Sequence, residues 1–77
     1  MSATLDRVIP IVAAVLRVPP ATLNAQSSPE DVPTWDSMQH LQIILALEES
    51  FAMKFAAHEI DQLQTVGALC DAVERRR

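Results

Sequence analysis

The sequence predicts a small all-α domain with three main helices and one short helix. Of its 77 residues 49% are apolar but only 4% are aromatic, so Leu, Ile, Val and Ala must build the core, which favours packed helices over a β-sandwich. A chain of this length buries only about 60% of the surface that its unfolded form exposes, which leaves little room for an enclosed active site. We therefore expect one domain over residues 1–77, with no catalytic residues of its own.

Charge limits the partners of this domain. The chain has ten acidic and six basic residues, and three of the basic ones are Arg75, Arg76 and Arg77, which we expect to form a frayed tail. The acidic remainder repels nucleic acid and anionic membranes and favours basic partners. No stretch approaches the roughly 20 apolar residues of a membrane span, and no basic segment precedes the first apolar run. We expect a cytoplasmic monomer without nucleic-acid or membrane partners.

A first helix is predicted over residues 5–16, because its apolar residues form one helical stripe. These residues are Leu5, Val8, Ile9, Val12, Val15 and Leu16. Ser2 or Thr4 can cap the helix, and Pro19 should stop it. Pro10 lies inside the pattern, where proline removes a backbone donor at a cost near 3 kcal/mol. Pro10 therefore predicts a kink or a helix that begins late.

Residues 19–36 contain four prolines and little periodicity, so they predict a long loop. A loop of about 18 residues exceeds the usual connection length and must be tethered. Its apolar residues Leu23, Val32 and Trp35 are available to pack onto the helices.

A second helix is predicted from Asp36, which with Gln39 has the spacing of a capping box. The apolar residues that follow form two separate faces when wound at 100° per residue. One face, which suits the core, consists of Ile43, Ile44, Leu47 and Phe51. The other consists of Met38, Leu41 and Leu45. This second face is either a partner-binding surface, flanked by Glu48 and Glu49, or a second core face under the loop.

The C-terminal part predicts a short helical piece over residues 57–61 and a final helix capped by Thr65. The apolar residues of the final helix are Val66, Leu69, Cys70 and Val73. Cys70 is the single cysteine, so no disulfide can form within the chain, and only His40 and His58 could join it at a metal. We expect no metal site and a buried, inert Cys70.

Ser37 is the candidate functional residue. A serine at the first turn of a helix has its hydroxyl beside unpaired N–H groups and the positive end of the helix dipole, which favours a phosphate on that oxygen. Asp36 adds an acidic oxygen that could hold a divalent cation. Alone, this pair describes an ordinary helix start as well as a functional site.

The wider run resembles the attachment-site helix of acyl carrier proteins. That family reads Asp-Ser-Leu followed by an apolar helix that closes in Ala-Leu-Glu-Glu and Phe, and residues 36–51 follow this pattern with Met38 in place of Leu. The resemblance implies that a separate, magnesium-using phosphopantetheinyl transferase esterifies Ser37 with 4′-phosphopantetheine from coenzyme A, assisted by Asp36. The arm's thiol would then hold an acyl group as a thioester and present it to partner enzymes.

The resemblance also implies which partners the chain meets. An acyl- or aminoacyl-activating ligase and downstream synthase enzymes would recognise a surface of the second helix. That surface would consist of Met38, Leu41, Leu45, Glu48 and Glu49. Trp35 stands where a small residue is common, and Gln39, His40 and Gln42 replace residues that are often acidic, which points to a stand-alone carrier of a specialised pathway.

Two alternatives stay open at this stage. An aminoacyl or peptidyl carrier would share the fold and the Ser37 attachment. An unmodified helical interaction module would use only the stripe of Met38, Leu41 and Leu45. His40 is expected to face a partner or to pack against the loop, because no third group orients it as a base.

Overall fold

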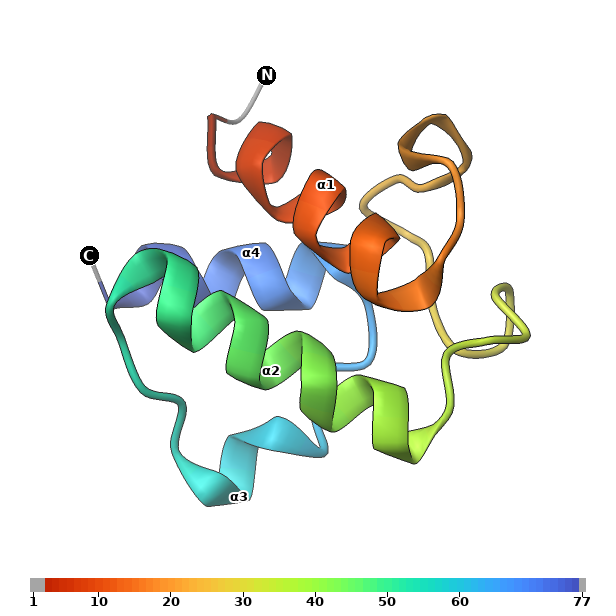
Figure 1. The fold of residues 1–77 in the computed structure, drawn as a ribbon. Helices are drawn as coiled ribbons and strands as arrows, with labels where there is room; N and C mark the ends of the chain where they lie inside the picture. Colours follow the sequence, from red (N-terminus) through yellow and green to blue (C-terminus); the bar gives the residue numbers. More distant parts are fainter. Residues whose placement is uncertain (1–2, 77) are drawn as a thin grey trace.

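The computed structural model describes residues 3–76 and confirms the predicted all-α fold (Figure 1). Its elements are α1 (Ala3–Leu16), the 3-10 helix η1 (Pro20–Thr22), α2 (Ser37–Phe51), α3 (Ala57–Ile60) and α4 (Val66–Arg75). α1 packs against both α2 and α4, while the short α3 lies apart from α1, on the far side of α2 (Figure 1). Within the described residues, no helix has the length and apolar character needed to span a membrane.

α1 runs unbroken through Pro10, so the predicted late start is wrong. Pro10 is exposed, whereas the stripe that includes Val8 and Val12 is fully buried on the opposite side. Proline has no N–H to donate to the backbone carbonyl four residues before it. Because this side of the helix is exposed, that carbonyl can accept hydrogen bonds from water instead. Thr4 does not cap the helix, because it lies inside α1 and is buried. The other predicted cap, Ser2, lies outside the described residues.

Both long helices α1 and α2 end on a left-handed residue that is not glycine. Arg17 has φ 60° and Ala52 has φ 51°. After α1, the Val18 N–H donates to the carbonyl oxygen of Ala13 over 3.1 Å, as in a Schellman motif. Ala52 carries the steric cost of a left-handed backbone without glycine's freedom.

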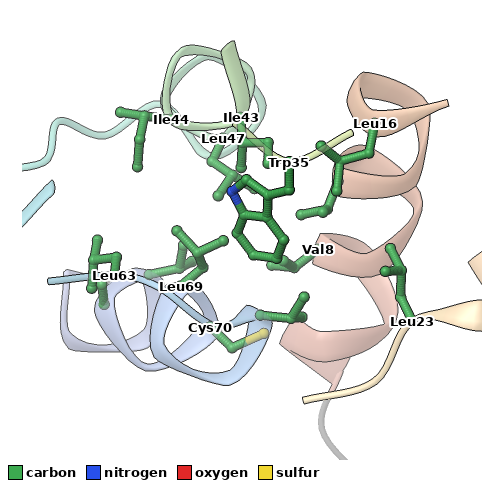
Figure 2. Packing of buried hydrophobic residues seen from close by; sticks show 14 of the residues in the cluster. Val8, Leu16, Leu23, Trp35, Ile43, Ile44, Leu47, Leu63, Leu69 and Cys70 are labelled. Atoms are coloured by element: carbon green, nitrogen blue, oxygen red, sulfur yellow. The ribbon is translucent and has the colours of Figure 1, made fainter. Parts of the chain in front are cut away.

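The loop between α1 and α2 is tethered by its apolar residues, as predicted. Leu23, Val32 and Trp35 are all buried. Figure 2 shows the Trp35 indole within the core cluster, with Leu16, Leu47 and Leu69 around it. The loop thus contributes the largest side chain of the core.

Backbone hydrogen bonds also fasten this loop to the start of α4, a contact that the sequence did not predict. The N–H of Val66 donates to the Ser27 carbonyl over 3.1 Å, and the N–H of Gly67 donates to the Ala25 carbonyl over 2.8 Å. The first N–H groups of a helix have no partner within it, so the loop supplies the missing acceptors. The loop comes so close at Gly67 that an added Cβ would lie 2.9 Å from the Ala25 oxygen.

The two predicted faces of α2 are separated as expected. Ile43, Ile44 and Leu47 are buried, and Phe51 is half-buried beneath the Arg7 guanidinium, which lies 4.2 Å from the ring centroid. The second face is exposed: Met38 is 68%, Leu41 53% and Leu45 57% accessible. The alternative in which this second face packs under the loop is therefore wrong.

The C-terminal segment is held more firmly than expected. Thr65 caps α4 by accepting a hydrogen bond from the N–H of Ala68 over 3.0 Å, as predicted. The expected frayed tail is wrong for Arg75, which ends α4, and for Arg76, whose Nε donates to the Lys54 carbonyl over 2.9 Å. Arg77 lies outside the described residues.

Arg76 also pairs with Glu59 of α3, and this pair anchors the short helix. Glu59 Oε1 accepts a second hydrogen bond from the Ala56 N–H over 2.7 Å. The hydrogen bond from Ala56 and the positive charge of Arg76 lower the pKa of the Glu59 carboxyl. Glu59 thus joins the start of α3 to the end of α4.

Cys70 is buried, as predicted, and desolvation raises the pKa of its thiol to about 11, with smaller contributions from Glu74 and Asp71. A thiol with this pKa stays protonated and unreactive at neutral pH.

Candidate functional site

The start of α2 is fixed by both acceptor groups of Asp36. Its side-chain Oδ1 accepts a hydrogen bond from the Gln39 N–H over 2.9 Å, and its backbone oxygen accepts one from the His40 N–H over 2.8 Å. The predicted N-cap is therefore confirmed. The second half of the predicted capping box is not formed, because the Asp36 N–H donates to the Thr34 carbonyl instead.

Ser37 is the first residue of α2 and is exposed. Its hydroxyl lies beside the N-terminal N–H groups of the helix, where the dipole favours an anion. The Asp36 cap holds this turn in place, so the hydroxyl is presented to solvent from a rigid support. The position suits an oxygen that has to be reached by a second protein and then carries a phosphate ester.

A cavity of about 410 Å³ opens beside Ser37, between the start of α2 and α3. Its volume lies in the range of small-molecule sites. Its walls combine apolar, amide and carboxylate groups and are formed by Pro29, Trp35, Asp36, Ser37, His40, Leu41, Ile60, Asp61 and Gln64. Ser37 is thus part of a cavity wall as well as of the helix N-terminus.

A buried hydrogen-bond chain lies behind this cavity. Trp35 Nε1 donates to His40 Nδ1 over 3.1 Å, and His40 Nε2 lies 2.9 Å from the Ile60 carbonyl oxygen. Because Nδ1 accepts, the proton of the neutral imidazole is on Nε2, which donates to Ile60. This Trp35–His40–Ile60 chain links the loop, α2 and α3.

His40 therefore packs against the loop, and the alternative in which it faces a partner is wrong: it is only 6% exposed. Both of its ring nitrogens are engaged, so it cannot act as a base toward Ser37. The sequence contained a sign of this arrangement. Trp35 and His40 both depart from the pattern of the family that the sequence resembles, and they flank Ser37.

The two acidic residues near the end of α2 differ in their surroundings. Glu49 is exposed. Glu48 is half-buried, and its Oε2 accepts a hydrogen bond from the Phe55 N–H over 2.9 Å. The interpretation of both residues as a solvated surface is therefore wrong for Glu48, which holds the chain that follows α2.

Comparison with known families and structures identifies the chain. The family model described as "Phosphopantetheine attachment site" matches residues 6–73, nearly the whole chain. The chain belongs to this phosphopantetheine attachment-site family. The solution NMR structure of a holo acyl carrier protein from Geobacter metallireducens is similar to it, with 35% identity and a TM-score of 0.86. The match covers 97% of this chain and 86% of that one.

Membership of the phosphopantetheine attachment-site family confirms the resemblance, the fold class and the cofactor predicted from sequence. The protein is a non-catalytic carrier that works through phosphopantetheine. The residues around Ser37 fit such a group, since an exposed hydroxyl, a helix N-terminus and a cavity of ligand size meet there. Within residues 3–76, no group of three or more His, Cys, Asp or Glu residues could hold a metal ion.

Proposed function

We propose that Ser37 carries the phosphopantetheine arm. The observation that carries this proposal is the position of Ser37, exposed directly after the Asp36 cap and in the wall of the 410 Å³ cavity. In the attachment step, the Ser37 oxygen forms a bond to the pantetheine-side phosphorus of coenzyme A. The bond from that phosphorus to the bridging oxygen breaks, adenosine 3′,5′-bisphosphate leaves, and the hydroxyl proton passes to a base of the transferase.

Asp36 assists this step by its charge. One of its oxygens, Oδ1, is engaged with the Gln39 N–H, and Oδ2 can take a magnesium ion that carries the phosphoryl donor. The cap holds the carboxylate next to the reacting hydroxyl, so the cation would be bound where the pyrophosphate of coenzyme A arrives.

The cargo of this arm is an acyl group, held as a thioester and presented to enzymes of a specialised pathway. The similarity to a holo acyl carrier protein supports this class of cargo. The cargo cannot be held on the chain's own thiol, because Cys70 is buried and its pKa is about 11. We also expect the protein to work in the cytoplasm, where the arm donor coenzyme A is available to it.

Partner enzymes dock on the exposed face of α2, made of Met38, Leu41, Leu45 and Glu49. Three large apolar side chains that are more than half exposed on one helix face are typical of a binding surface. The carboxylate of Glu49 is available to basic patches and should act on the association rate. Glu48 contributes less than the sequence suggested, because its carboxylate is bonded within the chain. The enzymes expected there are the transferase, an acyl-activating ligase and downstream synthases.

The attachment proposal is tested by intact mass after incubation with coenzyme A, magnesium and a broad-specificity phosphopantetheinyl transferase. The wild type should gain one phosphopantetheine group, Ser37→Ala none, and Ser50→Ala one. Ser50 is a matched control because it is an exposed serine of the same helix. Retention of the gain in Ser37→Ala contradicts the proposal, and full biological activity of that variant favours the unmodified interaction module.

The role of Asp36 is tested separately with Asp36→Asn. Asparagine caps helices about as well as aspartate, so α2 should stay intact. The rate of attachment should fall about 10-fold or more if the charge holds the cation, while the helical circular dichroism stays unchanged. An unchanged attachment rate limits Asp36 to its capping role.

A further inference from the structure

Three hydrogen bonds run in series from the end of α1 to the first turn of α2. The Thr34 hydroxyl donates to the Leu16 carbonyl oxygen over 2.9 Å. The Thr34 carbonyl oxygen accepts from the Asp36 N–H over 3.1 Å, and Asp36 Oδ1 accepts from the Gln39 N–H over 2.9 Å. We propose, resting on the proposed attachment at Ser37, that Thr34 positions the Asp36–Ser37 turn for that reaction by fixing it to α1.

The Leu16 carbonyl is a firm anchor for this bond. Leu16 is the last residue of α1 and is only 1% exposed. The last four carbonyl groups of a helix have no partner within it, and the left-handed Arg17, with φ 60°, turns the chain away directly afterwards. The Thr34 hydroxyl thus supplies a donor to a backbone group of the core that has none within its own helix.

The segment directly before α2 has few other restraints. Pro33 has no N–H to donate, and the Trp35 N–H donates to the Val32 carbonyl within the same segment, over 2.9 Å. The buried indole of Trp35 anchors one point, while Thr34 and Asp36 on either side of it are exposed. A segment that is held at a single point can rotate about it. The bond from Thr34 to α1 is a second point, and it prevents this rotation.

Hydrogen bonds rather than packing orient the Asp36 carboxylate. Asp36 is exposed and lies between two hollows. It lines the cavity beside Ser37 and also a second cavity of about 320 Å³ on its α1 side, whose walls include Leu16 and Thr34. Because the proton of its hydroxyl is engaged with Leu16, Thr34 acts through the position of this turn and not as a proton donor.

A fixed turn matters for attachment because the Ser37 oxygen has to meet the phosphorus of coenzyme A in one geometry. A displacement of about 1 Å can lower the rate of a reaction roughly 100-fold. Loss of the Thr34 bond leaves the Asp36 cap in place and adds other orientations of the turn, so we expect a smaller fall, about 10-fold, in the kcat of the transferase. The exposed face of α2 does not depend on this bond, so the KM for the carrier should change less than about twofold.

The experiment measures steady-state attachment by intact mass, with the full apo chain as the varied substrate of a broad-specificity phosphopantetheinyl transferase. Thr34→Val keeps the shape of the side chain without the hydroxyl and should lower kcat about 10-fold at nearly unchanged KM. Thr34→Ser keeps the hydroxyl and should restore kcat. Thr22→Val is a matched control that should leave kcat unchanged, because the Thr22 hydroxyl also donates to a carbonyl, that of Pro19 over 2.7 Å, but lies in η1.

Circular dichroism shows whether each variant is folded, and Thr34→Ala removes the hydroxyl in a second way if the valine variant does not fold. Three results overturn the positioning role alone. An unchanged kcat without the hydroxyl means that the bond does not position Ser37. A fall in kcat that Thr34→Ser does not restore has a cause other than the hydroxyl. A rise in KM at unchanged kcat places Thr34 on the docking surface. No attachment to the wild type removes the proposed attachment at Ser37 itself, and this inference with it.

Discussion

Replacement of His40 by leucine tests how much the buried Trp35–His40–Ile60 hydrogen-bond chain contributes to the free energy of unfolding. Leucine fills a similar volume but offers no polar atoms. The change leaves the buried Trp35 N–H without an acceptor and the Ile60 carbonyl without a donor. An unsatisfied buried group costs about 1–3 kcal/mol. Ile60 is half-exposed, so water can reach its carbonyl, and most of the cost comes from Trp35.

We therefore expect His40→Leu to lower the free energy of unfolding by about 2 kcal/mol. A domain of this size has a total stability of roughly 4–12 kcal/mol, so the urea midpoint should fall clearly, and helical circular dichroism measures it. The variant Trp35→Phe lacks the indole N–H, so replacing His40 in this background leaves no tryptophan donor unpaired. In that background His40→Leu should cost at least about 1 kcal/mol less, which is a coupling energy between contacting residues.

An equal cost of His40→Leu in both backgrounds would refute this reasoning, because the loss would then come from packing alone. A cost below about 0.5 kcal/mol in the wild-type background would refute it too, since surface changes commonly lie within that range. His58→Leu is a matched control: His58 is an exposed histidine of α3, and its replacement should leave the midpoint nearly unchanged.

Three further predictions concern single residues that are not part of the Trp35–His40–Ile60 hydrogen-bond chain. Gly67→Ala should destabilise the fold by about 1–2 kcal/mol in urea unfolding, because a Cβ 2.9 Å from the Ala25 oxygen forces the loop away; a stabilising effect would mean that helix propensity outweighs the contact. Ala52→Gly should raise the free energy of unfolding in urea by about 1 kcal/mol, because φ 51° suits glycine; an unchanged free energy of unfolding would contradict the idea that Ala52 is strained. The thiol of Cys70 has a pKa raised from 9.0 to about 11, so its contribution to stability is complete below pH 9 and is lost as the pH rises toward 11. Cys70→Ala should remove that part of the alkaline decline in urea unfolding, and an identical decline in both proteins contradicts the shift.

Local signals along the chain were sufficient to predict much of this structure. Asp36 and Thr65 cap helices as their positions indicated, because capping depends on residues three apart in the sequence. The two faces of α2 also followed from periodicity alone. The place of Ser37 after the Asp36 cap made it a candidate, but its prediction as the attachment residue came from the resemblance of residues 36–51 to the acyl carrier proteins.

Contacts between distant segments could not be predicted in this way. The hydrogen bonds from Val66 and Gly67 to the loop join residues about 40 positions apart, and no local pattern specifies them. The same holds for Arg76, which is ordered by Lys54 and Glu59 although an arginine run at a chain end is typical of a frayed tail.

Glu48 shows a subtler limit of sequence patterns. Its position beside Glu49 suggested a solvated acidic surface, but its carboxylate reaches the backbone of Phe55, seven residues on. Whether a helix side chain can form a hydrogen bond with the segment that follows the helix depends on the direction in which that segment turns. The left-handed conformation of Ala52 sets this turn, and an alanine gives no sequence signal for it.

The central claim is that Ser37 carries the arm, and fragmentation of the modified protein tests it most directly. Trypsin should release residues 18–54 as one peptide that contains Ser27, Ser28, Ser37 and Ser50. Tandem mass spectrometry of that peptide, after treatment with coenzyme A, magnesium and transferase, should locate phosphopantetheine on Ser37 alone. Phosphopantetheine on another of these serines, or no modification under conditions that modify a known carrier, would contradict the claim.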